Sequence, residues 1–177
     1  MNILFPIIGP INKSTEDLFV AQLSLIKKPE DIFVSYIASQ GGDANVTSAI
    51  IKKMLKLRGE TIVYAGNIVY SAGAIIFCSF NKRLAFENSK FLIHESIPPK
   101  GMLRTEIFEQ YDLLNWKIMS KRMKISLSDL EIVGKKGKPM SSYEALEIGL
   151  VDKILKGKWE NNYKKILSLN KKEDLLL

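Results

Sequence analysis

The clearest indication of the fold of this chain is the stretch Asp31-Ile32-Phe33-Val34-Ser35-Tyr36-Ile37-Ala38-Ser39-Gln40-Gly41-Gly42. Its first eight residues predict a β-strand whose apolar side chains alternate onto both faces. Such a strand is typical of a parallel sheet that is covered on its two sides. The glycine pair precedes a helical pattern and lets the backbone turn sharply or approach a ligand, although an ordinary turn is the commoner explanation of such a pair. The stretch predicts one strand–turn–helix unit of an α/β protein.

Further strands alternate with helices along the chain. We expect these strands at residues 3–8, 61–65, 83–86, 89–94 and 150–155. The strands at 83–86 and 89–94 are expected to pair around a turn at Asn88-Ser89, and residues 67–70 are expected to form a loop. Since no repeat or linker interrupts the alternation, we expect one domain at 1–155 and a basic tail at 156–177.

The helices are recognised by apolar spacing and by capping residues. We expect them at residues 14–28, 43–57, 71–80, 104–124 and 141–149. Ser14 is the expected cap of the first helix, and Pro29 ends it. Ser141 and Glu144 have the spacing of a capping box.

The composition indicates a globular protein without a nucleic-acid or membrane partner. The net charge is +7, but no nucleic-acid motif accompanies the lysines, so a solvated face and a lysine-rich tail explain them better. The apolar first residues lack a basic region before them and contain prolines, so we interpret them as a strand rather than a signal peptide. The single cysteine, Cys78, excludes an intramolecular disulfide and favours a reducing compartment, and we expect a cytoplasmic protein.

Two residues are candidates for nucleophilic catalysis. Ser71 lies in Tyr70-Ser71-Ala72-Gly73-Ala74, at the expected start of an apolar helix, where serine often serves only as a cap. His94 is the only histidine of the chain, and it ends an apolar strand, where histidine is more often structural. Together they suggest a serine nucleophile and a histidine base. The amides of Gly42 and Ala72 are candidates for an oxyanion hole.

Metal and cofactor chemistry are not expected. One histidine and one cysteine cannot build a usual metal site, and we take Cys78 as a small core residue. No cofactor is required by acyl transfer through a serine.

Several segments, in the same order, resemble the Clp protease proteolytic subunit family (ClpP). They are Ile8-Gly9-Pro10-Ile11-Asn12, Tyr36-Ile37-Ala38-Ser39-Gln40-Gly41-Gly42, Ser71-Ala72-Gly73-Ala74, Asn88-Ser89-Lys90-Phe91-Leu92-Ile93-His94, Met140-Ser141-Ser142-Tyr143-Glu144-Ala145 and Gly149-Leu150-Val151-Asp152. The resemblance covers about Ile3 to Leu155. It implies the ClpP/crotonase-like fold, a spiral of ββα units with a protruding long helix.

The same resemblance implies a serine endopeptidase that acts on peptides or unfolded proteins. Ser71 would be the nucleophile, His94 the general base, and the amides of Gly42 and Ala72 the oxyanion hole. It also implies a homo-oligomeric ring, in which the long helix at 104–124 mediates contact between rings.

Three departures from the family pattern modify these expectations. Counting back from Met140 places Val133, not an acid, where the family has its triad aspartate. Glu131, a backbone carbonyl or a partner subunit could then orient His94, or activity could be low. The sequence starts at the first strand, without the family's axial segment, so partnership with an AAA+ ATPase is in doubt. Pro98-Pro99 replaces a glycine-rich stretch, so ring stacking or size is expected to differ.

Three functions remain open at this point. The first is a cytoplasmic serine endopeptidase with an acyl-enzyme at Ser71. The second is a catalytically weak or inactive ring subunit, which the missing acid favours. The third is an acyl-CoA enzyme on the same fold, for which the Ser71 and His94 motifs would be coincidental.

Overall fold

The computed structural model describes residues 2–158, and most of the expected tail at 156–177 lies outside them. The strands are β1 (Asn2–Ile8), β2 (Ile32–Ser39), β3 (Glu60–Tyr70), β4 (Lys82–Phe86), β5 (Lys90–Leu92), β6 (Met140–Ser141) and β7 (Lys153–Leu155). The helices are α1 (Lys13–Leu23), α2 (Ala44–Met54), α3 (Ala72–Cys78), α4 (Glu106–Ser120), α5 (Leu127–Lys136) and α6 (Ser142–Glu147). The mixed α/β fold with a mostly parallel sheet confirms the expected fold class.

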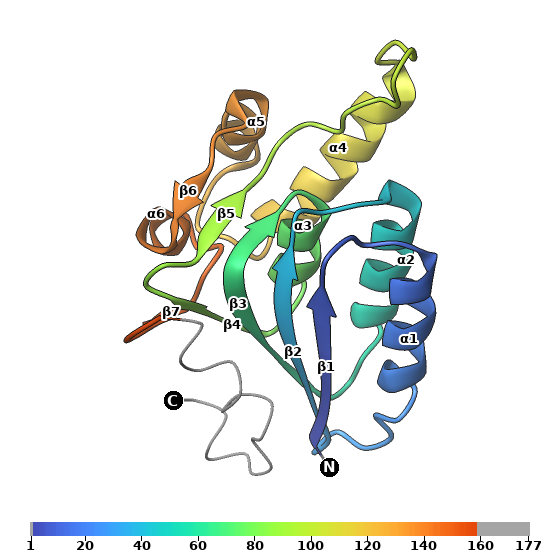
Figure 1. Cartoon of the computed structure of the whole chain (residues 1–177), viewed down its shortest axis with the longest axis vertical. Coiled ribbons are helices and arrows are strands. Elements are labelled where there is room, and N and C mark those ends of the chain that lie inside the picture. Colours follow the sequence, from blue (N-terminus) through green and yellow to red (C-terminus); the bar gives the residue numbers. More distant parts are fainter. Residues whose placement is uncertain (1, 159–177) are drawn as a thin grey trace.

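The sheet has the strand order β1-β2-β3-β4-β7, with every neighbouring pair parallel. Helices α1, α2 and α3 lie together along one face (Figure 1). The side chains of β2 separate into two apolar clusters, with Phe33 and Ile37 on the helix-covered side and Val34 and Tyr36 on the other. Burial on both faces confirms the prediction made from the pattern at 31–38.

The middle of β3 bends and redirects the strand. Ile37 pairs with Ala65 but Ser39 pairs with Val69, so β3 contains extra residues relative to β2. Before this bulge β3 pairs with β4, and after it β3 pairs with β5. The loop predicted at 67–70 and the pairing predicted between 83–86 and 89–94 are therefore wrong. Both strands that follow β3 lie beside it, on successive parts of its length, and not beside each other.

The ends of the helices were predicted with mixed success. The cap of α1 is Asn12 rather than Ser14, because the Asn12 side chain accepts a hydrogen bond from the Thr15 amide. The capping box of Ser141 and Glu144 is confirmed at α6. Helix α5 was not predicted, although a serine cap at its start and a left-handed glycine at its end, Gly137, are ordinary helix signals.

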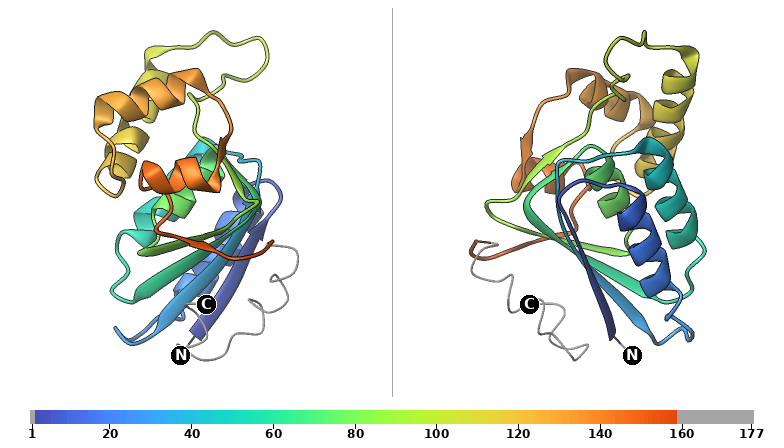
Figure 2. Two further views of the ribbon diagram at one scale, coloured as in Figure 1. Left: turned by 90° about the vertical axis from the view of Figure 1, so that its left-hand side faces the viewer. Right: turned by 45° about the vertical axis from the view of Figure 1, so that its right-hand side comes forward.

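Helix α4 and the loop before it project beyond the edge of the sheet (Figure 2). Within residues 2–158, no helix has both the length and the apolar character needed to cross a membrane.

Candidate active site

Ser71 is held in a strained conformation at the turn from β3 into α3. Its φ is 56° and its ψ is −124°, and it is the only non-glycine residue with positive φ in the described chain. Such backbone geometry costs on the order of 1–3 kcal/mol and is characteristic of functional sites. A sharp strand-to-helix turn of this kind exposes a serine hydroxyl above the sheet.

The Ser71 hydroxyl does not cap α3. No side-chain capping hydrogen bond is found at this helix in the described part of the chain, so the ordinary explanation of a serine at this position does not hold. The Ser71 amide instead donates to the Leu92 carbonyl at 2.8 Å. That bond ties Ser71 to β5, the strand that leads to His94.

The first glycine of the pair permits a close approach to Ser71. Gly41 has φ +107°, and a Cβ built on it would lie 2.7 Å from the Ser71 Cβ. Any side chain there would displace the serine or the turn. The requirement for glycine at this turn is therefore steric and directly linked to Ser71.

The second glycine of the pair, Gly42, lines the same cavity as Ser71. The Ile11 amide donates to the Gly41 carbonyl and the Asp43 amide donates to the Ile11 carbonyl, each at 2.9 Å. These two bonds form a parallel bridge between Ile11 and Gly42, and they turn the N–H of Gly42 away from Ile11. A Cβ on Gly42 would lie 2.0 Å from the Ile11 carbonyl oxygen, so this position also requires glycine.

One cavity of about 560 Å³ brings four of the five predicted site residues together. Gly42, Ser71, Ala72 and His94 all line it, and α4 supplies another part of its wall. The α4 residues are Phe108, Tyr111, Asp112, Asn115 and Trp116.

The imidazole of His94 bonds a backbone carbonyl. Its Nδ1 lies 2.5 Å from the carbonyl oxygen of Glu95. Because a carbonyl only accepts, Nδ1 must carry the proton, and in the neutral ring Nε2 is left as the acceptor. This is the tautomer that a general base for a serine hydroxyl needs.

Glu131, the acid considered from the sequence, does not line the cavity described above. It lies on α5, where its carboxylate pairs with the Lys135 ammonium at 2.8 Å. Its role in orienting His94 stays a prediction. Val133 packs against the hydrophobic core, whereas Gly137 lies beside the histidine, since a Cβ on it would be 3.4 Å from the His94 Cβ.

A buried polar cluster next to His94 was missed from the sequence. Asp112 is 3% exposed and accepts hydrogen bonds from the Ser96 amide, the Ser96 hydroxyl and the Arg104 guanidinium. The hydrogen bond to Asp112 raises the pKa of Arg104, so the guanidinium stays charged. Asp112 lies one turn from both Phe108 and Trp116, so a carboxylate on a buried helix face was the available signal.

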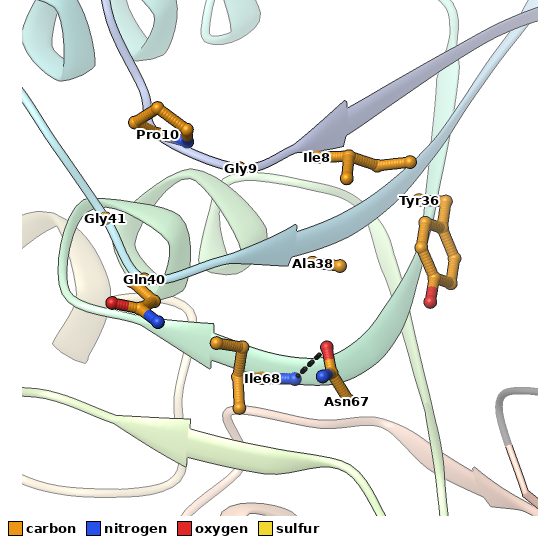
Figure 3. A pocket seen from close by; sticks show the side chains of 9 residues that line it. All are labelled: Ile8, Gly9, Pro10, Tyr36, Ala38, Gln40, Gly41, Asn67 and Ile68. Atoms are coloured by element: carbon orange, nitrogen blue, oxygen red, sulfur yellow. Dashed lines mark hydrogen bonds between the residues drawn. The ribbon is translucent and has the colours of Figure 1, made fainter.

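A second cavity, of about 670 Å³, lies beside the Gly41 turn (Figure 3). It opens between the ends of β1 and β2 and the bulge of β3, with mostly apolar lining, and Gln40 lines both cavities. In Figure 3 the Asn67 side chain accepts from the Ile68 amide and so stabilises the bulge.

The remaining reactive groups show no sign of metal or thiol chemistry. Among residues 2–158 no group of three or more His, Cys, Asp or Glu side chains is arranged to hold a metal ion. Cys78 is buried, and burial raises the pKa of its thiol to about 11, so it is not a nucleophile at neutral pH.

A comparison with known protein families identifies the family of the chain. The family model described as Clp protease matches residues 3–158, which include Ser71, His94 and both glycines of the turn. The match spans most of the chain, and the parallel sheet with its projecting helix is consistent with the same family. The chain therefore belongs to the Clp protease family.

Proposed function

We propose that this protein is a serine endopeptidase in which Ser71 is the nucleophile and His94 the general base. One observation carries the proposal. Ser71 has a strained backbone and a hydroxyl that does not cap α3, and it lines one cavity with the only histidine of the chain. Membership of the Clp protease family supports peptidase chemistry in general.

The reaction follows from the roles of these groups. The Ser71 oxygen attacks the substrate carbonyl carbon while its proton moves to His94 Nε2. The carbonyl electrons move to oxygen, where the amides of Gly42 and Ala72 stabilise the oxyanion. The carbon–nitrogen bond then breaks, and the amine leaves with the proton from Nε2. Water repeats the sequence on the acyl-enzyme and releases Ser71.

We infer that an extended peptide occupies this cavity, because backbone segments line it. Gly42–Asn45 lines one part of it, and Ser96 and Ile97 line another. A chain lying between two such backbone segments places a peptide bond near Ser71. Peptides and unfolded proteins are accordingly the proposed substrates.

A fluorophosphonate serine-hydrolase probe tests this proposal directly. We expect one adduct per wild-type chain by intact-mass measurement, mapped to Ser71 by peptide sequencing, because only an activated serine reacts at neutral pH. Heat-denatured protein is the control and should not react. Folded wild-type protein that remains unlabelled, or that is labelled elsewhere, would contradict the proposal.

A second candidate function is a weakly active or inactive ring subunit. It is favoured by the bond from His94 to a neutral backbone carbonyl, where a triad has a carboxylate. Slow but Ser71-specific labelling would indicate a weak peptidase, and absent labelling would favour the inactive subunit.

We further propose that the protein forms homo-oligomers through α4 and the loop before it. Large apolar side chains are exposed there, including Met102 at 65%, Leu103 at 85% and Ile107 at 75%. Clustered exposed apolar residues mark protein–protein contacts. Ring assembly agrees with the family, while a cytoplasmic location stays a prediction from the sequence.

Replacing Leu103 and Ile107 together by glutamate is expected to abolish the largest assembly. Charges introduced at a buried apolar contact cannot be paired, so assembly should stop at a smaller oligomer or at the protomer of 20.0 kDa. Native mass spectrometry reads the result. The control is Tyr143→Glu on α6, where the side chain is 54% exposed. An unchanged mass in the double variant would place the contact elsewhere.

A further inference from the structure

The hydrogen bond from His94 to the Glu95 carbonyl can hold the imidazole in place only if that carbonyl is itself held in place. The carbonyl belongs to the peptide unit that joins Glu95 to Ser96. A peptide unit is planar, so its C=O and the N–H of the next residue move together. The groups that bind the Ser96 amide therefore determine where the acceptor of His94 lies.

That amide donates to a buried carboxylate. The Ser96 nitrogen lies 3.0 and 3.1 Å from the two carboxylate oxygens of Asp112, and the Ser96 hydroxyl donates to the same group. Asp112 is almost completely buried, so its position is fixed by α4. One peptide unit thus connects the carboxylate of Asp112 at its N–H end with the imidazole of His94 at its C=O end.

Arg104 completes the cluster and balances its charge. Its guanidinium donates to Asp112 and, at 2.7 Å, to the carbonyl of Ser96, and it lies 3.7 Å from the Glu95 carboxylate. The guanidinium therefore balances the charge of the carboxylate at this buried position. An ionised carboxylate that accepts from an N–H polarises the peptide and strengthens its carbonyl as an acceptor.

We infer that Asp112 is the positioning residue for His94 and acts on it through the Glu95–Ser96 peptide unit. Asp112 therefore orients the histidine, as the acid of a triad does, but it makes no direct hydrogen bond to the imidazole. The inference rests on the proposed function for its catalytic meaning, but the tautomer of the His94 imidazole can be measured independently of catalysis.

The test compares Asp112→Asn with wild type by two measurements. The asparagine keeps the shape and one acceptor oxygen but removes the charge. We expect probe labelling at Ser71 to slow about tenfold, less than the ~10⁴-fold cost of altering an acid that bonds the histidine directly. In ¹⁵N-histidine solid-state NMR spectra the His94 imidazole of the wild type should be protonated at Nδ1. The variant should show a mixture of the Nδ1–H and Nε2–H tautomers.

Two further variants separate positioning from simple support of the loop. Ser96→Ala keeps the amide and removes only the hydroxyl, so it should label within about twofold of wild type if the peptide unit carries the effect. Glu109→Gln, an exposed change on the same helix, is the control. If Asp112→Asn fails to fold, the double variant Asp112→Asn with Arg104→Gln also removes the cation that has lost its carboxylate partner, and it is measured instead.

The outcomes for Asp112 and for the peptidase are distinguishable. A folded Asp112→Asn variant with the wild-type tautomer overturns the inference, as does a Ser96→Ala variant that is as slow as Asp112→Asn. Wild-type protein that does not label overturns the proposed function alone, because the NMR spectra still decide how Asp112 acts on His94.

Discussion

Replacing Ser71 by glycine is expected to abolish hydrolysis and to raise the free energy of unfolding by about 1 kcal/mol. The φ of 56° and ψ of −124° at Ser71 are costly for any residue with a Cβ and accessible to glycine. The strain released, on the order of 1–3 kcal/mol, exceeds the extra entropy that glycine loses on folding, about 0.5–1 kcal/mol. Loss of the nucleophile should lower kcat by at least ~10⁴-fold.

Ser71→Ala is the matched control because it removes the hydroxyl and keeps the strain. It should be as inactive as the glycine variant, yet its stability should stay within about 0.5 kcal/mol of wild type. Urea unfolding at one fixed protomer concentration gives the stabilities, and peptide turnover gives the activities. Equal stability of the alanine and glycine variants would show that no strain is released at Ser71. Retained turnover in either variant would place the nucleophile elsewhere.

Elements with a strong local pattern could be predicted from the sequence. The strand at 31–38 and the helix after the glycine pair were predicted from apolar periodicity within a few residues of each other. The path of β3 could not be predicted, because its bulge is determined by pairing with β2, about 30 residues earlier. The local pattern at Asn67–Tyr70 contains no information about that partner.

In the candidate site, too, residues with a local motif could be predicted, and features that depend on distant partners could not. Ser71 and His94 were recognisable from short motifs, and the structure places them on one cavity. The backbone strain at Ser71 could not be predicted, since it depends on how β3 meets α3. Asp112 was missed because its partner Ser96 lies in the loop before α4, and only the folded arrangement of that loop brings them together.

Replacing Gly137 by aspartate is expected to accelerate the fluorophosphonate labelling of Ser71 on the order of a hundredfold. A carboxylate that bonds a catalytic histidine directly contributes up to ~10⁴-fold, and part of this effect is already supplied by the Glu95 carbonyl. Gly137 is suitable because a Cβ there would contact the His94 Cβ at 3.4 Å without meeting closer atoms. Aspartate also tolerates the left-handed conformation of Gly137, with φ of 53°.

Gly137→Asn separates the charge from the shape of the new side chain. Both variants should lose about 1–2 kcal/mol of stability, because each introduces a Cβ at positive φ. The aspartate variant also places an anion at the C-terminal end of α5, where the helix dipole disfavours it. Only aspartate should accelerate labelling, since asparagine cannot stabilise the imidazolium formed when His94 takes the proton. Equal acceleration by both would show that orientation alone limits the reaction. No acceleration by either would mean that the Glu95–Ser96 peptide unit, held by Asp112, already gives His94 all the support that the reaction uses.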